Sequence, residues 1–92
     1  MTMQYEYSLA KKAANLKKHG LSFDDAKQVI ESAQTVTFED NRYDYDEARY
    51  ITLGLLNGDV VAIVTAETDT TVRIISMRKA EKNEQTIYYE KR

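Results

Sequence analysis

The dipeptide Asn57-Gly58 constrains the fold of this chain more than any other short segment. A two-residue type I′ turn needs a positive φ at both central positions, and Asn followed by Gly meets that need at little steric cost. Before the turn, Ile51, Leu53 and Leu55 alternate with other residues, which is the period of a strand. The sequence therefore predicts an antiparallel hairpin made of residues 49–56 and 59–66.

Three other segments have the β-branched or aromatic character of strands. The last of them follows a turn at residues 69–70 and extends the hairpin into an antiparallel meander. A polar and acidic stretch, residues 40–46, separates another of them from the hairpin and is typical of a loop. The three predicted strands are residues 4–7, 35–39 and 71–77.

Helical spacing begins after Ser8, whose hydroxyl can accept a hydrogen bond from an orphan N–H in the first helical turn. Leu9, Ala13 and Leu16 recur at i, i+4 and i+7 and form the apolar stripe expected to pack on the sheet. Gly20 follows the last turn and suits the left-handed conformation that ends many helices. The sequence predicts a first helix between Ser8 and Gly20.

A second helix is predicted from Ser22 to about Ala33, and a third over residues 78–89. The third has only a weak apolar stripe. Arg78 and Lys79 stand at its predicted start, where positive charge opposes the helix macrodipole. Two cations in that position indicate a nearby anion. The apolar face predicted for the second helix consists of Phe23, Ala26, Val29, Ile30 and Ala33.

The predicted order is β-α-α-β-β-β-β-α, which places the chain in the α+β class. Two N-terminal helices would cover one face of a small, mainly antiparallel sheet. The opposite face would be partly open, because only the weakly apolar C-terminal helix remains to cover it. Such a face is a place for a substrate or a partner.

The chain has 92 residues, which is enough for one hydrophobic core and not for two, so we predict a single domain over residues 1–92. It has no Cys, which excludes disulfides and thiolate metal sites. No apolar run approaches the ~20 residues that span a bilayer, and the N-terminus lacks a signal-peptide pattern. We expect a cytoplasmic protein that uses no metal, cofactor or membrane.

The formal net charge of −2 does not favour nucleic-acid binding by itself. The charges are unevenly distributed, because a basic start and a basic end flank an acidic middle. This pattern is compatible with an ordinary solvated surface, and it matters for function only if the fold brings the basic segments together.

Metal-free cleavage of RNA remains compatible with this composition. That reaction needs a group to take the proton of the 2′-OH, a group to protonate the leaving 5′-oxygen, and cations to hold the phosphorane charge. Each candidate also has a plain structural interpretation: His19 could cap the first helix, and Glu47 with Arg49 could be a surface ion pair of little energetic value. The candidates are His19, Glu47, Glu67, Arg49, Arg73, Arg78, Lys79 and Tyr88.

Three blocks of the sequence, in this order, resemble the BrnT family of type II toxin–antitoxin toxins. The first block reads Asn15-Leu16-Lys17-Lys18-His19-Gly20-Leu21-Ser22-Phe23-Asp24-Asp25-Ala26. The second reads Glu47-Ala48-Arg49-Tyr50-Ile51-Thr52-Leu53-Gly54. The third reads Arg73-Ile74-Ile75-Ser76-Met77-Arg78-Lys79-Ala80. The resemblance extends over nearly the whole chain, from Tyr5 to Tyr88.

The resemblance implies a RelE-like fold and a metal-independent endoribonuclease that inhibits translation. It also implies neutralisation by a BrnA-like antitoxin of the ribbon-helix-helix type, with DNA bound only through that antitoxin. Residues at matching positions would carry the chemistry. The catalytic candidates are His19, Glu67, Arg49 and Arg78, and the candidates for binding RNA phosphate are Lys18, Arg73 and Lys79.

The end of the central hairpin strand departs from the family pattern, which commonly has Thr-Glu-Arg there. This chain has Thr65-Ala66-Glu67-Thr68, so the Glu is kept and Thr68 occupies the Arg position. The alternative hypothesis is a catalytically weak or inactive binding module that forms a DNA-binding autorepressor complex with its antitoxin.

Overall fold

The computed structural model describes residues 3–41 and 47–92. Residues 42–46, most of the predicted acidic loop, lie outside the described residues. The predicted α+β class is confirmed. The strands are β1 (Gln4–Glu6), β2 (Val36–Glu39), β3 (Arg49–Leu56), β4 (Asp59–Glu67) and β5 (Thr71–Lys79). The helices are α1 (Leu9–His19), a 3₁₀ turn η1 (Phe23–Asp25), α2 (Ala26–Ile30) and α3 (Lys82–Lys91).

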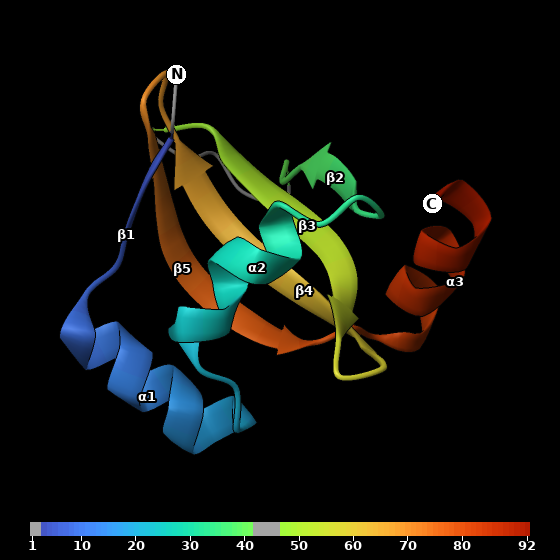
Figure 1. Cartoon of the computed structure of the whole chain (residues 1–92), viewed down its shortest axis with the longest axis horizontal. Helices are drawn as coiled ribbons and strands as arrows, with labels where there is room; N and C mark the ends of the chain where they lie inside the picture. The colour runs from blue at the N-terminus through green and yellow to red at the C-terminus, as the bar shows by residue number, and fades with distance from the viewer. Residues whose placement is uncertain (1–2, 42–46) are drawn as a thin grey trace.

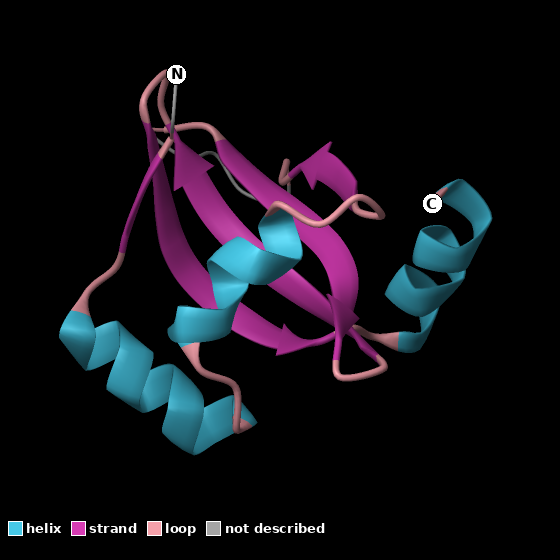
Figure 2. Cartoon of the chain, viewed as in Figure 1, coloured by secondary structure: helices cyan, strands magenta, loops and turns pink. Residues whose placement is uncertain are grey.

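The described strands form one five-stranded sheet in the order β1-β5-β4-β3-β2. β1 runs parallel to β5, and the other neighbours are antiparallel. The predicted hairpin is confirmed, since Asn57 has a φ of 52° and Gly58 a φ of 87°. In Figure 1, α2 crosses the front of the sheet, α1 lies beside β5, and α3 stands at the side of the hairpin end. Figure 2 shows the same layers by type of element.

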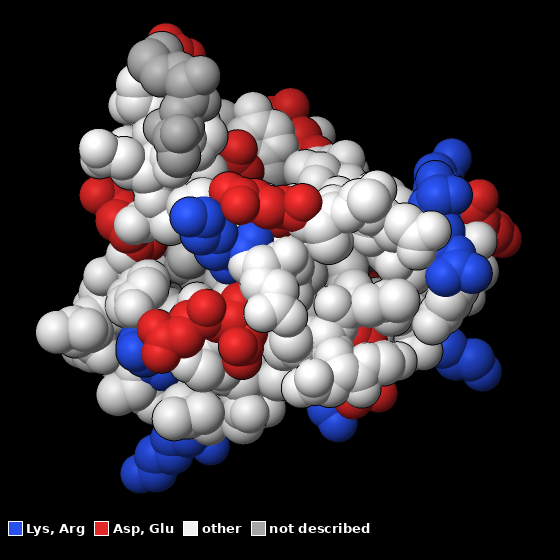
Figure 3. Space-filling model, viewed as in Figure 1, with Lys and Arg blue, Asp and Glu red and all other residues white. Residues whose placement is uncertain are grey.

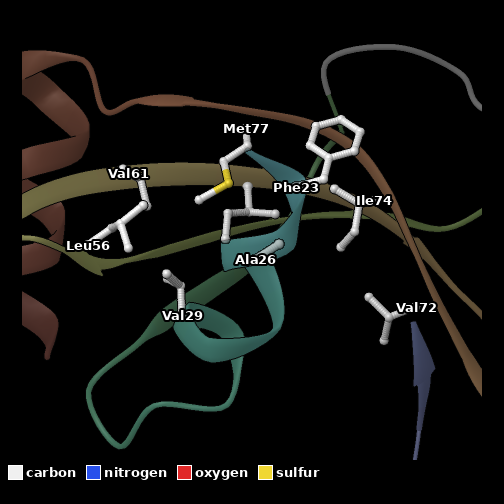
Figure 4. Close-up of a cluster of buried hydrophobic side chains, with 9 residues drawn as sticks. Phe23, Ala26, Val29, Leu56, Val61, Val72, Ile74 and Met77 are labelled. Carbon is white, nitrogen blue, oxygen red and sulfur yellow. The ribbon is translucent and has the colours of Figure 1, made fainter. Parts of the chain in front are cut away.

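One face of the sheet, the helix face, packs against η1 and α2. Phe23, Ala26 and Val29 point from these segments into a buried cluster with residues of β3, β4 and β5 (Figure 4). Gly54 of β3 allows this close approach, because a Cβ there would lie 2.6 Å from Val29 Cγ1. The strand residues of the cluster are Leu56, Val61, Ile63, Val72, Ile74 and Met77.

A second cluster occupies the opposite face, where α3 packs. Tyr88 is fully buried there and its hydroxyl donates to the carbonyl oxygen of Gln34 at 3.0 Å. This hydrogen bond of Tyr88 therefore joins α3 to the segment before β2. Where α3 packs, this face is closed, because the strand residues of the cluster are buried. The other buried members are Ile51, Leu53, Val60, Ala62, Val64 and Ala80.

The orientation of α1 differs from the prediction. Ser8 caps the helix and Gly20 ends it with a φ of 70°, as expected. The predicted stripe does not pack on the sheet, because Leu9 is 76% exposed and Leu16 49% exposed. Asn15 is the buried residue instead, at 7% exposure. A polar contact therefore determines which side of α1 faces the protein.

Two element ends also differ from the prediction. α2 ends at Ile30, and the chain then turns, so that Ala33 is exposed. β5 continues through Arg78 and Lys79, and α3 begins only at Lys82. The prediction that these two cations stand at a helix N-terminus is wrong. Backbone pairing of Lys79 with Val61 and of Arg78 with Ala62 keeps both in the sheet.

Candidate active site

Two arginines stand on one face of the sheet with a small residue between them. Arg49 of β3 and Arg73 of β5 both pair with Ala66 of β4. Residues directly opposite one another in a sheet share a face, so both side chains project from the face opposite the helix face. Because neighbouring strands lie about 4.8 Å apart, their Cα atoms are about 10 Å apart. We call this side, which also carries Arg78, the arginine face.

A carboxylate lies between these two arginines. Arg73 Nη2 donates to Glu47 Oε1, and Arg49 Nη2 lies 3.9 Å from the same oxygen. The planar guanidinium group can donate to two oxygens of either a carboxylate or a phosphate. The position of Glu47 indicates where two arginines can hold one anion.

Arg78 lies further along the same face, opposite Ala62. Its guanidinium donates twice to Glu84 of α3, with Nη1–Oε1 at 2.6 Å and Nη2–Oε2 at 3.0 Å. Glu84 also accepts from the backbone N–H of Glu81 at 2.8 Å and so completes a capping box. The Glu84 side chain is 9% exposed and that of Arg78 20%. This bidentate pair joins the end of β5 to the first turn of α3.

A hollow of about 230 Å³ lies between α1 and β5. Its strand side is formed by Ile75 and Ser76, where β5 carries an extra residue: Val64 pairs with Ser76, but Thr65 pairs with Ile74. Such a bulge bends the strand and redirects side chains. Ser76 shares the arginine face with Arg73 and Arg78. The helix side of the hollow is formed by Lys11, Ala14, Asn15, Lys18 and His19.

The basic residues at the end of α1 are stabilised by their position in the helix. Lys17, Lys18 and His19 occupy the last turn, next to the negative end of the helix dipole. Asn15 fixes this end against β5 by bonding to the backbone of Met77, and its Nδ2 also donates to the carbonyl oxygen of Leu21 at 3.0 Å. The hollow is thus a cationic surface on a fixed framework.

Glu67 is separated from the other catalytic candidates. It pairs with Val72, a residue of the helix face, and so projects away from the arginines. Its Oε2 accepts from the Thr65 hydroxyl at 2.7 Å. Glu67 also lies near Tyr5, whose pKa is raised to about 12 by burial, then by the hydrogen bond to Glu31 and the charges of Glu31 and Glu67.

Lys79 is separated in the same way. Lys79 pairs with Val61 on the helix face. Its side chain is 71% exposed, and its Nζ lies 4.0 Å from Asp59 Oδ2. Among the sequence candidates, the fold therefore brings Lys18 and His19 to the hollow beside Ser76, and brings Arg49 and Arg73 together around Glu47. Figure 3 shows the helix face, where charges of both signs are mixed and form no continuous basic surface.

The comparison with protein families gives a match that covers most of the chain. The chain matches, over residues 7–84, the family described as the ribonuclease toxin BrnT of type II toxin–antitoxin systems. The chain belongs to the BrnT family. The comparison with curated proteins gives no match.

The third block of this BrnT-family chain contacts both of the other blocks. The first block provides Asn15, Lys18 and His19 at the end of α1, and the second provides Glu47 and Arg49 at the start of β3. The third block is most of β5 and contains the bulge. β5 therefore contacts residues of both earlier blocks, the first at the hollow and the second at Arg73.

Neither the bulge nor the hollow beside it was predicted from the sequence. A signal was present, because the buried residues of β5 are spaced by two from Val72 to Ile74 and by three from Ile74 to Met77. A break from the period of two indicates an extra residue in a strand. In residues 3–41 and 47–92, no group of three His, Cys, Asp or Glu side chains has the arrangement of a metal site. No helix there has the length and apolar character to cross a membrane.

Proposed function

We propose that this BrnT-family toxin is an endoribonuclease that cleaves RNA without a metal ion and thereby inhibits translation. The observation that carries the proposal is the pair of arginines, Arg49 and Arg73, which converge on one carboxylate oxygen of Glu47. A phosphate of the RNA backbone presents the same kind of acceptor to the same two donors. Membership of a ribonuclease toxin family supports RNA as the source of that phosphate.

In the proposed reaction the 2′-oxygen attacks the adjacent phosphorus, a 2′,3′-cyclic phosphate forms, and the bond to the 5′-oxygen breaks. The proton of the 2′-OH leaves to a base, and an acid returns a proton to the 5′-oxygen. Arg49 and Arg73 stabilise the charge that develops on the phosphorane, and Arg78, further along the same face, adds positive charge for the RNA strand. Lys18 binds an adjacent phosphate.

His19 transfers protons in this proposal. It lines the hollow beside Ser76, on the strand that also carries Arg73 and Arg78. Histidine is the side chain whose ordinary pKa lies nearest neutrality. Glu67 is the competing group for proton transfer, but its projection from the helix face supports His19 over Glu67.

We also propose a RelE-like fold and a BrnA-like antitoxin of the ribbon-helix-helix type, which would contact DNA on behalf of the complex. The first is supported by the covering of one sheet face by the N-terminal helical segments, by the antiparallel meander, and by the C-terminal helix on the other face. The second is supported by the family, whose members are toxins of type II toxin–antitoxin systems.

The test is cleavage of a synthetic single-stranded RNA by the purified chain in the presence of EDTA, together with growth of bacteria that express the chain. Arg49→Ala, Arg73→Ala and His19→Ala should each lower the cleavage rate by ~100-fold or more and relieve growth arrest. Lys79→Ala is the matched control, because it removes an exposed cation from the other face and should keep the wild-type rate. Circular dichroism establishes that each variant is folded.

Equal rates for wild type and the arginine variants would overturn the proposed site. Loss of cleavage in Glu67→Gln with full activity in His19→Ala would show that Glu67, on the helix face, transfers the protons. Cleavage that disappears with EDTA and returns with added Mg²⁺ would contradict the metal-independent mechanism.

A second candidate function is a binding module with little catalysis, and Thr68 favours it. Where the family commonly has Arg, the Thr68 hydroxyl accepts from the backbone N–H of Thr71 at 3.1 Å and so closes the turn between β4 and β5. The position thus has a structural use here and supplies no cation. A chain that binds its antitoxin but gives no cleavage or growth arrest would establish this second function.

A further inference from the structure

The helix α1 presents an apolar stripe to solvent. Leu9, Ala13 and Leu16 are all exposed, the two leucines by 76% and 49% of their surface. They recur at i, i+4 and i+7, so they lie on one side of the helix over two turns, about 10 Å in length. We call these three residues the α1 stripe.

The described residues leave most of this stripe uncovered. The side of α1 that faces the protein makes polar contacts: Asn15 bonds to the backbone of β5, and Lys12 Nζ donates to Asp24 Oδ1 at 2.9 Å. An amphipathic helix normally buries its apolar side, whereas α1 is held by its polar side. A row of apolar residues at this spacing is the pattern by which one helix binds another.

The charges around the stripe indicate the chemistry of a partner. α1 contains four lysines and His19 but no acidic residue. In Figure 3, Lys and Arg side chains project from the lower left of the molecule, where Figure 1 places α1. A second copy of the chain is disfavoured as the occupant, because two α1 helices side by side would bring like charges together.

We propose that the α1 stripe is a docking surface for the antitoxin, which places on it an amphipathic helix with leucine-like and acidic residues. This inference rests on the proposed function for the identity of the partner. A helix docked here also lies beside Lys18 and His19, which line the hollow on the same helix. Its acidic residues would compete with RNA phosphate for those cations.

The stripe is the apolar anchor of such an interface and not the whole of it. Stable interfaces bury about 800 Å² on each partner, and a short helix provides part of that area. Anchor residues of this kind carry a large share of the binding energy. Loss of both leucines should therefore weaken binding by about 100-fold or more.

The experiment uses the polypeptide encoded next to the gene of this chain, co-expressed with the tagged full-length chain. Retention on the affinity resin is measured for wild type, for Leu9→Ser/Leu16→Ser, and for the matched control Tyr89→Ser, which removes an exposed apolar side chain from α3. Hydrogen exchange of the purified complex is compared with that of the chain alone. We expect protection of the backbone of residues 9–19, loss of retention in the double variant, and full retention in the control.

Lys17→Glu provides a second readout, because it adds an acidic charge beside the stripe without removing apolar surface. It should weaken retention, and more strongly at low salt. This variant keeps the proposal testable if the double leucine variant fails to fold.

The proposal is overturned if wild type and the stripe variants retain the polypeptide equally, or if wild type retains none. It is also overturned if wild type alone is a dimer that Leu9→Ser/Leu16→Ser converts to a monomer. The cleavage assay distinguishes these failures from a failure of the proposed function. If wild type and the stripe variants retain the polypeptide equally but wild type cleaves RNA, only the docking proposal is contradicted. If the stripe variants lose retention but wild type cleaves no RNA, only the proposed ribonuclease function is contradicted.

Discussion

The side chain of Asn15 is bonded to both backbone groups of Met77. Its Nδ2 donates to the Met77 carbonyl at 2.8 Å, and the Met77 N–H donates to its Oδ1 at 3.0 Å. β1 covers the edge of β5 only at Thr71, Val72 and Arg73. The carboxamide of Asn15 therefore takes the place of a neighbouring strand further along that edge, and it fixes α1 and the hollow to the sheet.

Asn15→Ala is expected to lower the free energy of unfolding by about 2–4 kcal/mol, because it leaves the buried N–H and C=O of Met77 without these bonds. Urea denaturation followed by circular dichroism measures the change. Lys17→Ala, an exposed site on the same helix, should change the value by less than about 0.5 kcal/mol. Equal stability of Asn15→Ala and Lys17→Ala would show that the edge of β5 does not depend on Asn15.

Gly54→Ala is expected to destabilise the fold by about 1–3 kcal/mol through overpacking. The new Cβ would lie 2.6 Å from Val29 Cγ1, and the β-branched Val29 is buried and has little freedom to move away. Gly54→Ala should cost less stability in a Val29→Ala background than in wild type, because the shortened side chain at position 29 leaves room for the new Cβ. Thermal denaturation of the four proteins provides the cycle. Strict additivity of the two changes would contradict a direct contact.

Acid should remove a contribution of Asp24 to stability. The pKa of Asp24 is lowered by the hydrogen bond from Lys12 first and by that from Tyr7 second. A carboxyl whose pKa is lower in the folded state stabilises the fold above its unfolded pKa of about 3.9. That stabilisation is lost as the pH falls through the folded pKa.

Urea midpoints of wild type and Asp24→Asn at about pH 7 and about pH 3 test this dependence. Wild type should be the more stable protein near neutral pH, and the difference should shrink in acid. Because the pair is exposed at the surface, salt should reduce the difference as well. A difference that is the same at both pH values would mean that the charge of Asp24 has no role.

The meander was predictable because its signals are local. Asn57-Gly58 determines the turn, and the alternation of its flanking strands determines their faces. The orientation of α1 was not predictable from periodicity, since Leu9 and Leu16 have the spacing of a buried stripe and one polar side chain, Asn15, prevails through bonds to a strand 62 residues away. Tertiary hydrogen bonds of this kind leave no mark on the pattern of a single helix.

Candidate site residues could be selected from the sequence, but the face of the sheet on which each one lies could not. Motif resemblance selected Arg49, Arg73 and His19, but resemblance assigns no face. The separation of Glu67 from the arginines follows from the pairing of Ala66 and Glu67 with successive residues of β5. Pairing register is a property of two strands together, and a bulge elsewhere in β5 changes the relation between sequence spacing and face.

Glu84→Gln is expected to loosen α3 and to lower the free energy of unfolding by about 1–3 kcal/mol. The substitution keeps an amide oxygen for the capping bond from the Glu81 N–H, but it removes the charge that Arg78 contacts twice. Removing one member of a largely buried ion pair costs more than the pair is worth, because the remaining charge stays desolvated. Glu90→Gln, which removes an exposed charge from the same helix, is the control.

Hydrogen exchange in α3 and the urea midpoint are measured for both variants of this helix. In Glu84→Gln, exchange should accelerate over residues 82–91 more than in β3 and β4, since the Arg78 pair holds only the first turn of α3 to the sheet. Tyr88 should then be the remaining anchor, through its burial and its bond to the Gln34 carbonyl. If Glu84→Gln and Glu90→Gln exchange at the same rate, the ion pair of Glu84 with Arg78 does not hold α3 to the sheet.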